Sequence, residues 1–407
     1  MNNIHFPKIL WSTCLIALSA ITAAPAFAEA SPYYYGGGLG LTHVSNIYRE
    51  AGGGNSDTIA TASLLAGLDQ RLGRARVFAD LSLQHNRYQD NSSLNNQSYS
   101  LKGGLDFATV ERISGTLSGS KTRALATYNV ANGVNPIFKK NIEDNDSIDA
   151  VMRLGLVARY SLEAGVGYRT RTFSANEYAA LEYRQKRASA GLIYRPSSDL
   201  RLGIAARQTR GEFPRYSLVG GVYQASEYKR NDIDLTGRWV LSGASNLEGR
   251  VSSGKSTQTS GVGRDFSGVT GQLTWNWLPT ARWNLSTTVI RDTGLETSFV
   301  NANIGNLTLD QNRLTTALQF NGGYELTSKI YLNAGASLNK TDRVNEFLAQ
   351  RSNDYERDTA YNFGARYQYS RGVQFSCQLS HQARGSNTPL YVYSANSYGC
   401  SGQLILN

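Results

Sequence analysis

The sequence predicts an all-β fold, a transmembrane up-and-down antiparallel β-barrel of about 18 strands. Three observations predict it. Apolar and polar residues alternate along most of the chain, short polar turns alternate with longer polar connections, and an export signal precedes the first alternating segment. A period of two places successive side chains on opposite faces of a strand, so one face meets an apolar medium and the other meets water.

The first 28 residues have the features of a cleaved signal peptide. Lys8 precedes an apolar run from Ile9 to Ala24, and a small-residue cleavage site ends at Ala28. We expect cleavage between Ala28 and Glu29, and we expect residues 29–407 to form a single barrel domain in the cell outer membrane. No later apolar run approaches the ~18 residues of a spanning helix, which excludes a helical inner-membrane protein.

Alternating segments come in pairs that predict β-hairpins. Apolar residues recur at every second position from Ile148 to Ala158 and from Leu162 to Tyr168, and the same pattern runs from Val373 to Ala383. Short turns are expected where turn-forming residues interrupt the pattern, near Gly73, Val110, Ser161, Ser197, Gly243, Pro279, Ser328 and Arg371.

Longer connections, polar and rich in Gly, Asn and Asp, separate these hairpins. They are expected at 45–57, 89–97, 127–146, 174–180, 211–227, 256–265, 293–311, 341–357 and 385–390. Eight short turns and nine longer connections imply about 18 strands with both chain ends on the short-turn side. In bacterial outer-membrane barrels the short turns face the periplasm and the longer loops are extracellular.

A secreted propeller or solenoid is the competing interpretation. Either fold requires a repeat of fixed length, and the turn spacing varies here. The polar faces also carry many arginines, which a dry core would desolvate at high cost. Aromatic residues near the expected turns favour the barrel, because they resemble an interfacial girdle: Tyr160, Tyr194, Trp239, Trp275, Trp277, Trp283, Tyr324 and Tyr369.

The polar faces of the expected strands predict a basic lumen. The formal net charge is +10, and a pore lined by basic residues favours anionic solutes. The alternative is that the arginines pair with acids and brace the wall. The candidate lumen-lining residues are Arg153, Arg159, Arg169, Arg171, Arg187, Arg207, Arg238, Arg250, Arg366, Glu163 and Glu248.

Two cysteines remain after removal of the signal peptide. Cys377 and Cys400 both lie on apolar faces, and they are symmetric about Thr388 and Pro389. A hairpin that turns there places them opposite each other. In an exported protein this favours a disulfide over a metal pair, provided that the register brings the two residues close enough.

No motif of an enzyme or of a metal or cofactor site is present. The four histidines lack metal-ligand spacing, and the G-x-S-x-G, Walker and H-E-x-x-H motifs are absent. We therefore expect no catalytic residues, no cofactor and no metal. Nucleic-acid binding is also not expected, because the positive charge is spread over strands and forms no basic patch on a nucleic-acid-binding motif.

Several short segments resemble a known family. They are Ser45-Asn46-Ile47-Tyr48-Arg49, Asn86-Arg87-Tyr88, Leu94-Asn95, Tyr99, Leu101, Gly103-Gly104-Leu105-Asp106 and Ser114-Gly115-Thr116-Leu117-Ser118. These segments resemble porin-like outer-membrane β-barrel proteins encoded with exopolysaccharide biosynthesis, the EpsL type. The chain departs from most such barrels at its end, where Leu404-Ile405-Leu406-Asn407 replaces a terminal aromatic residue.

The resemblance implies a channel that takes part in exopolysaccharide export across the outer membrane. Its expected partners are outer-membrane lipid, a polysaccharide substrate, a periplasmic polysaccharide-export protein and the barrel-assembly machinery. Two alternatives remain open: a general diffusion porin for small anionic solutes, and a non-transport surface barrel that serves as an adhesin, scaffold or hydrolase.

Overall fold

The computed structural model describes residues 31–110, 112–128, 137–155, 159–219, 221–258, 266–293, 314–347 and 350–406. The predicted signal peptide, with its cleavage site between Ala28 and Glu29, lies outside the described residues. Most of the predicted connections 256–265 and 293–311 lie outside them too. Within the described part of the chain, no helix is long and apolar enough to cross a membrane.

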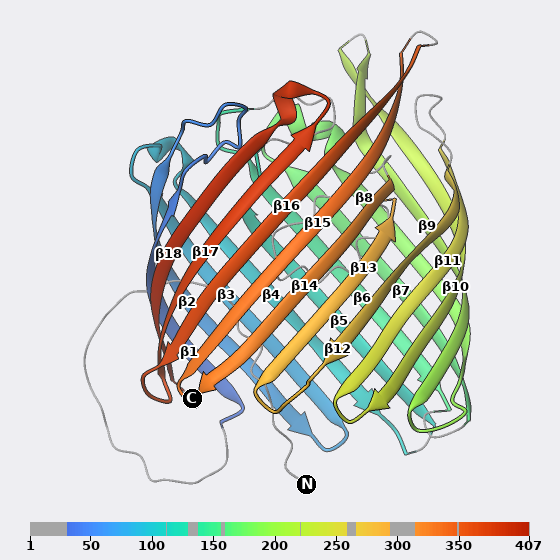
Figure 1. Cartoon of the computed structure of the whole chain (residues 1–407). Helices are drawn as coiled ribbons and strands as arrows, with labels where there is room; N and C mark the ends of the chain where they lie inside the picture. The colour runs from blue at the N-terminus through green and yellow to red at the C-terminus, as the bar shows by residue number, and fades with distance from the viewer. Residues whose placement is uncertain are drawn as a thin grey trace.

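The chain forms one 18-stranded antiparallel sheet, as the alternation predicts (Figure 1). The strands are β1 (Tyr33–Val44), β2 (Asp57–Leu72), β3 (Ala75–Tyr88), β4 (Asn96–Ala108), β5 (Ile113–Leu125), β6 (Ile142–Leu154), β7 (Tyr160–Phe173), β8 (Tyr183–Tyr194), β9 (Leu200–Val219), β10 (Val222–Ser242), β11 (Ser245–Gln258), β12 (Phe266–Trp277), β13 (Trp283–Asp292), β14 (Leu314–Thr327), β15 (Ile330–Phe347), β16 (Gln350–Gln368), β17 (Val373–Ser386) and β18 (Tyr393–Leu406). In the described parts of the longer connections there are three 3-10 helices: η1 (Ser92–Leu94), η2 (Asn176–Leu181) and η4 (Pro389–Tyr391).

The sheet closes into a barrel because β1 pairs with both β2 and β18. Every other strand pairs with its neighbours in sequence, which is the up-and-down order. The strands are tilted against the barrel axis, and β1 begins and β18 ends at the short-turn end (Figure 1). A closed barrel leaves no unpaired strand edge, and this allows it to span a bilayer.

Apolar side chains cover the outer face of the barrel. On β7, Leu162 and Val166 are 56% and 58% exposed. Ser161, which precedes Leu162 and points to the opposite face, is buried. These exposed residues are the ones that the alternation assigns to the apolar face. Since an aqueous surface would not expose so many large apolar side chains, this face lies against lipid.

Aromatic pairs mark the short-turn end of the lipid-facing surface. Tyr160 and Tyr194 stack with ring centroids 5.0 Å apart, and Trp275 and Trp277 stack at 5.4 Å. Trp283 and Tyr324 lie 4.5 Å apart. Rings of this kind occupy the membrane interface, so these pairs place the periplasmic boundary of the bilayer near the short turns.

The short turns lie close to the predicted positions. Gly73 has a φ of +61°, a left-handed conformation that glycine adopts without a Cβ clash, and it lies in the two-residue connection between β2 and β3. One turn is displaced. Ser161, predicted at a turn, belongs to β7, and the connection runs from 155 to 159 because β6 ends at Leu154.

Two predicted long loops are wrong. Most of 211–227 belongs to β9 and β10, and most of 341–357 belongs to β15 and β16. These hairpins extend past the other strands at the extracellular end (Figure 1). Strand segments in water have no apolar face, so their sequences lack the alternation and resemble loops.

The extracellular connections that follow β1, β3, β5 and β7 pack together. Their buried apolar side chains form a group that we call the loop cluster: Ile47, Tyr48, Leu94, Tyr128, Ile137, Ala175, Tyr178 and Leu181. Leu94 is fully buried. The largest apolar core of the described residues therefore lies at the extracellular end and not inside the barrel wall.

Candidate channel lining

The inner face of β6 to β11 carries the charged residues that the sequence assigns to a lumen. On β7, Glu163, Arg169 and Arg171 alternate with the lipid-facing row that contains Leu162 and Val166. Successive side chains of a strand point to opposite faces, so these charges lie inside the barrel. The structure joins most of them into charge triads, by which we mean one carboxylate shared by two arginines.

The first charge triad is centred on Glu163 near the periplasmic end. Its Oε2 atom lies 2.6 Å from Arg153 Nε and 3.2 Å from Arg201 Nη2. The register explains the contact, because Arg153 is the direct cross-strand partner of Glu163. All three side chains are about one-third exposed, so water and dissolved ions reach them.

The second charge triad is centred on Asp149, one step farther from the periplasm. Its Oδ1 atom accepts a hydrogen bond from Arg187 Nη2 at 2.9 Å, and its Oδ2 atom accepts one from Arg169 Nη2 at 3.3 Å. Gly167 lies opposite Asp149 in the register, and its missing side chain leaves room for the carboxylate. The aspartate side chain is 22% exposed.

The third charge triad is centred on Asp234 and is buried. Arg207 donates from Nε to Oδ2 at 2.7 Å and from Nη2 to Oδ1 at 3.0 Å, a bidentate contact. Arg250 Nη1 lies 3.5 Å from Oδ1 and also donates to Ser252. The exposed fraction of the central carboxylate thus falls from 34% to 22% to 7% along the three charge triads.

Each charge triad has a formal charge of +1, because two guanidinium groups share one carboxylate. Pairing of the arginines with acids is therefore compatible with a basic lumen. The ion pairs connect neighbouring strands, and a surplus positive charge remains at each level. A buried pair contributes little net stability, since desolvation offsets the attraction. The central carboxylate of the Glu163 triad is the most water-exposed of the three.

Sequence reasoning missed Arg230 and Asp232, which extend the inner wall above the third triad. Arg230 is fully buried, and its Nε donates to Asp232 at 2.9 Å. Its Nη1 and Nη2 atoms donate to Thr293 at 2.5 Å and Thr270 at 3.0 Å. The two-residue period of Tyr228, Arg230, Asp232 and Asp234 is the signal that would have found them.

The other predicted lining residues have different surroundings. Arg171 is buried between the rings of Phe173 and Tyr183 and donates to the carbonyl of Leu181, so it holds η2. Arg159 is not in a strand; it lies in the turn before β7, over the ring of Tyr194.

The remaining three lie on inner-face rows. Arg238 and Glu248 are exposed cross-strand partners near the periplasmic end. Arg366 lies over the ring of Tyr331, with the guanidinium carbon 4.7 Å from the centroid. Because Arg238 is also the cross-strand partner of Arg201, Arg238 and Glu248 add one positive and one negative group beside the Glu163 triad.

On the opposite side of the barrel, the serines of β17 and β18 give the inner face neutral polar groups. In the ring of strands, β17 lies half a turn from β8. Inner-face hydroxyls pair across β17 and β18, with Ser376 and Ser401 Oγ atoms 2.9 Å apart and those of Ser380 and Ser397 2.6 Å apart. The lumen is therefore asymmetric, because the charge triads lie on β6 to β11 and the serine pairs lie on the opposite side, where Arg384 pairs with Asp358.

The two cysteines lie on the lipid-facing rows of β17 and β18. They are direct cross-strand partners, their Cα atoms are 4.0 Å apart, and a disulfide joins them. The register explains the pairing, because the connection around η4 is centred on the predicted turn.

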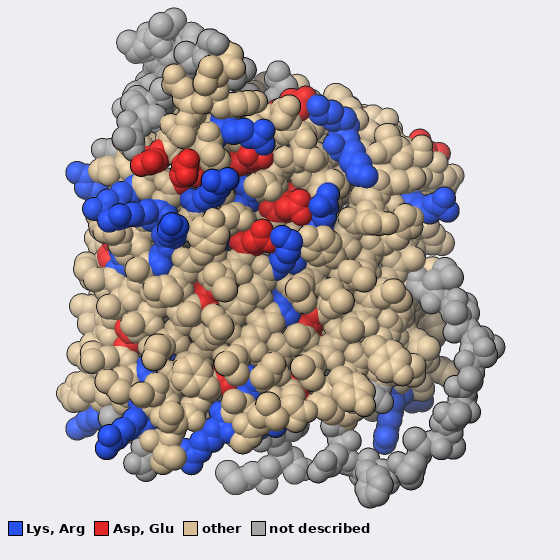
Figure 2. Space-filling view, turned by 180° about the vertical axis from the view of Figure 1, so that it is seen from behind, with Lys and Arg blue, Asp and Glu red and all other residues tan. Residues whose placement is uncertain are grey.

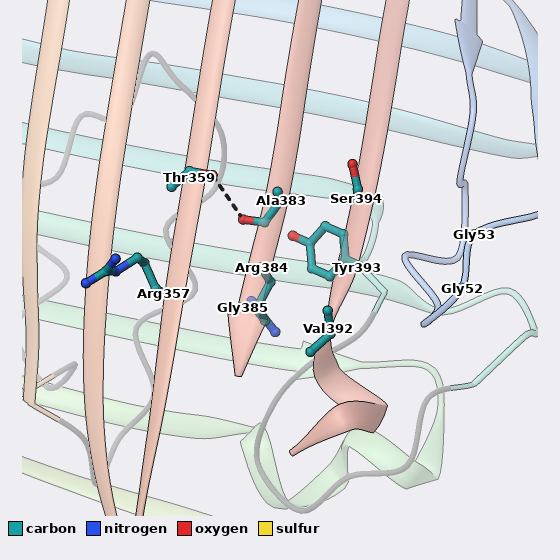
Figure 3. Close-up of a pocket in the computed structure, with 10 residues that line it drawn as sticks. All are labelled: Gly52, Gly53, Arg357, Thr359, Ala383, Arg384, Gly385, Val392, Tyr393 and Ser394. Atoms are coloured by element: carbon teal, nitrogen blue, oxygen red, sulfur yellow. Dashed lines mark hydrogen bonds between the residues drawn. The ribbon is translucent and has the colours of Figure 1, made fainter. Parts of the chain in front are cut away.

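A groove of about 600 Å³ lies at the extracellular rim, outside the channel lining (Figure 3). Its residues come from the first connection and from β16 to β18: Gly52, Gly53, Arg357, Thr359, Ala383, Arg384, Gly385, Val392, Tyr393 and Ser394. Thr359 donates to the carbonyl of Ala383 within it (Figure 3). Arg384 is paired with Asp358 at 2.6 Å.

Over the described residues, no group of three or more His, Cys, Asp or Glu side chains is placed to hold a metal ion.

Comparisons with known proteins agree with the architecture. The outer-membrane protein OccK2 (OpdF) of Pseudomonas aeruginosa, solved with glucuronate, is similar with a TM-score of 0.50 and 11% identity over 92% of this chain and 98% of that chain. The present chain has the fold of an outer-membrane β-barrel. OpdK of Pseudomonas aeruginosa, solved with vanillate, has a TM-score of 0.48 and 11% identity over 92% of this chain and 99% of its own.

At this level of identity the likeness establishes the fold alone. No protein-family model matches this chain, and no curated protein matches it. The EpsL-type resemblance therefore depends on the short segments of the sequence.

Proposed function

We propose that this barrel is a passive outer-membrane channel for small anionic solutes. The observation that carries the proposal is the set of three charge triads on β6 to β11, each with one surplus positive charge. A basic wall in a confined lumen raises the local concentration of anions. The serine pairs on β17 and β18 opposite add neutral hydrogen-bonding groups.

Burial of the inner wall supports small solutes over a polymer. Inner-face side chains toward the extracellular end are almost fully buried, including Arg230, Ser252 and Thr270. Buried wall residues do not line open water at that level, which implies a narrower path than an 18-stranded barrel would leave if it were empty. Glucuronate, the solute in the OccK2 complex, belongs to the chemical class proposed here.

Exopolysaccharide export receives less support. The segment that resembles EpsL-type barrels has a structural role in this chain, because Asn46 Nδ2 donates to the carbonyls of Glu50 at 3.0 Å and Ser394 at 3.1 Å. Tyr48 packs in the loop cluster. Export of a polymer would further require a periplasmic partner, whereas diffusion of a small solute requires only the barrel.

Reconstitution of the refolded mature protein in planar bilayers tests the proposal. A KCl gradient should give a reversal potential of the sign for anion preference, and liposomes should take up glucuronate faster than a neutral sugar of equal size. Cation preference, or equal uptake of both sugars, would contradict an anion channel. An acidic polysaccharide in the same bilayer forms the second arm, since block of the current by the polymer at low concentration would favour polymer export.

A further inference from the structure

Three cations lie side by side on the outer face of the barrel. Lys186 on β8, Arg210 on β9 and Lys229 on β10 are direct cross-strand partners, and all three are exposed. They continue the rows that contain Leu192, Ile204 and Leu235, which face lipid. We call these three residues the cationic row.

The cationic row lacks a carboxylate of its own. Among the described residues, no ion pair joins any of the three to an acid, and Arg210 Nε instead donates to Gln208 Oε1 at 3.0 Å. One level higher, Arg184, Glu212 and Glu227 form the next row of cross-strand partners. Like charges placed opposite each other on a sheet repel, so the cationic row is more stable with an anion bound to it.

A groove in the lipid-facing wall lies directly beneath the cationic row. It has a volume of about 450 Å³, and small side chains on neighbouring strands form its floor: Ala188, Ala190, Ala206 and Ser253, with Ile233 beside them. Gln208 and Asn231, hydrogen-bonded to each other at 2.9 Å, separate the groove from the cations. The wall thus combines an apolar depression with positive charge at its upper end.

The height of the cationic row matches the boundary of the outer leaflet. On β10 the girdle residue Trp239 lies ten positions from Lys229. With a rise of ~3.3 Å per residue and a strand tilt of ~40°, this separation spans about 25 Å across the membrane. That is roughly the height of the apolar band of an outer-membrane barrel. Charged side chains gather above a mostly uncharged band on this side of the molecule (Figure 2).

We infer that the cationic row and the groove together bind one anionic lipid of the outer leaflet. Its phosphate lies against Lys186, Arg210 and Lys229, and one acyl chain fills the alanine-lined groove. The Gln208–Asn231 pair orients the Arg210 guanidinium, which is suited to bidentate recognition of phosphate. This inference is independent of the solute that passes through the lumen.

Lipid binding by two matched double variants tests whether the charges of the cationic row hold the lipid. Lys186→Gln/Lys229→Gln removes two cations of the row, and Lys121→Gln/Lys340→Gln removes two outward lysines that already pair with Asp146 at 2.8 Å and Asp342 at 3.1 Å. The probe is bisphosphorylated lipid A added to the folded barrel in detergent, with bound lipid counted by native mass spectrometry. We expect at least tenfold weaker binding for the first variant and no change for the second. Equal loss in both, or in neither, would overturn the inference.

Two further arms separate a lipid from free phosphate. Ala206→Phe fills the groove without a change of charge, and we expect it to weaken lipid A binding severalfold. Dephosphorylated lipid A should bind poorly to the wild type. If Ala206→Phe has no effect and inorganic phosphate displaces lipid A at millimolar concentration, the site is a phosphate site and the lipid assignment is wrong. Heat-modified gel mobility of each variant confirms that the barrel is folded.

Discussion

Cys377 and Cys400 are direct cross-strand partners on the lipid-facing rows of β17 and β18, with Cα atoms 4.0 Å apart and a disulfide between them. The bond closes a loop with a sequence separation of 23 residues. It lies next to the seam, since β18 is the strand that pairs with β1 to complete the barrel. The last hairpin is thus covalently fixed in register.

Removal of this disulfide should lower the stability of the barrel. Closing a loop of this length reduces the entropy of the unfolded chain by an amount equivalent to roughly 3 kcal/mol. We expect Cys377→Ser/Cys400→Ser to unfold at a lower urea concentration than the wild type, followed by tryptophan fluorescence in detergent. A reductant should shift the wild type to the midpoint of the double variant and leave the variant unchanged. A midpoint insensitive to reductant would contradict the prediction.

The position of this disulfide could be predicted from the sequence because it depends only on alternation and on the centre of one turn. The same two signals predicted which faces of β6 and β7 are apolar, since Ile148 and Val166 repeat at a period of two and face lipid. Apolar and polar residues alternate where one face of a strand meets lipid and the other meets water. The alternation is informative wherever a strand crosses the membrane and uninformative in the extended hairpins beyond it.

The charge triads could not be predicted in the same way. Their contacts depend on the side-chain geometry of three strands at once: Arg201 on β9 reaches Glu163 on β7 across the intervening β8. The loop cluster was missed because its apolar residues are isolated within polar connections. Leu94, for example, has no periodic neighbours, and only the packing of four loops explains its burial.

Opposite changes in the first charge triad should shift ion selectivity in opposite directions. Glu163→Gln leaves Arg153 and Arg201 without their shared carboxylate and should raise anion preference, whereas Arg201→Gln should lower it. A unit charge ~8 Å from an ion in water changes its energy by about 0.5 kcal/mol, roughly a twofold effect on partition. Reversal potentials in a KCl gradient measure both changes. Lys121→Gln, on the lipid-facing side, serves as the control and should change neither.

Loss of the buried guanidinium on β10 should destabilise the extracellular half of the wall. Arg230→Met leaves Asp232 buried with a weakened set of partners, and breaking a buried pair from one side costs about 3–5 kcal/mol. Arg238→Met, on the inner face of the same strand but exposed, should cost less than about 0.5 kcal/mol. Urea midpoints of the two variants compare the positions directly. Arg230→Met/Asp232→Leu should recover part of the loss, and a double variant no better than the single one would count against a buried ion pair.

The loop cluster should open when its central side chain is shortened. Leu94 is fully buried, and a Leu→Ala change in a packed core costs about 2–5 kcal/mol. Because the cluster lies outside the barrel wall, we expect Leu94→Ala to increase local opening while the barrel stays folded. Limited proteolysis of intact outer-membrane vesicles should cleave the extracellular loops at least tenfold faster. Leu83→Ala, at a lipid-facing position that is 42% exposed, should leave the rate unchanged.

Alkaline pH should open the same cluster through Tyr48. Burial, together with the negative charges of Asp57 and Glu50, raises the pKa of the Tyr48 hydroxyl above its ordinary value of about 10. A raised pKa in the folded state means that the neutral form is favoured there. Its contribution to stability is therefore complete below about pH 10 and is lost as the pH rises through the folded-state pKa. The hydroxyl also donates to Asn91 Oδ1 at 3.2 Å, a bond that ionisation removes.

Proteolysis of the extracellular loops at a series of pH values, with a protease active in alkali, measures this opening. The wild-type rate should rise above pH 10, and Tyr48→Phe, which cannot ionise, should shift the rise to higher pH. Since Tyr128 lies in contact with Tyr48, with ring centroids 5.1 Å apart, and burial raises its pKa as well, the variant should retain a second, later rise. Identical pH profiles for the two proteins would show that Tyr48 ionisation does not control the cluster.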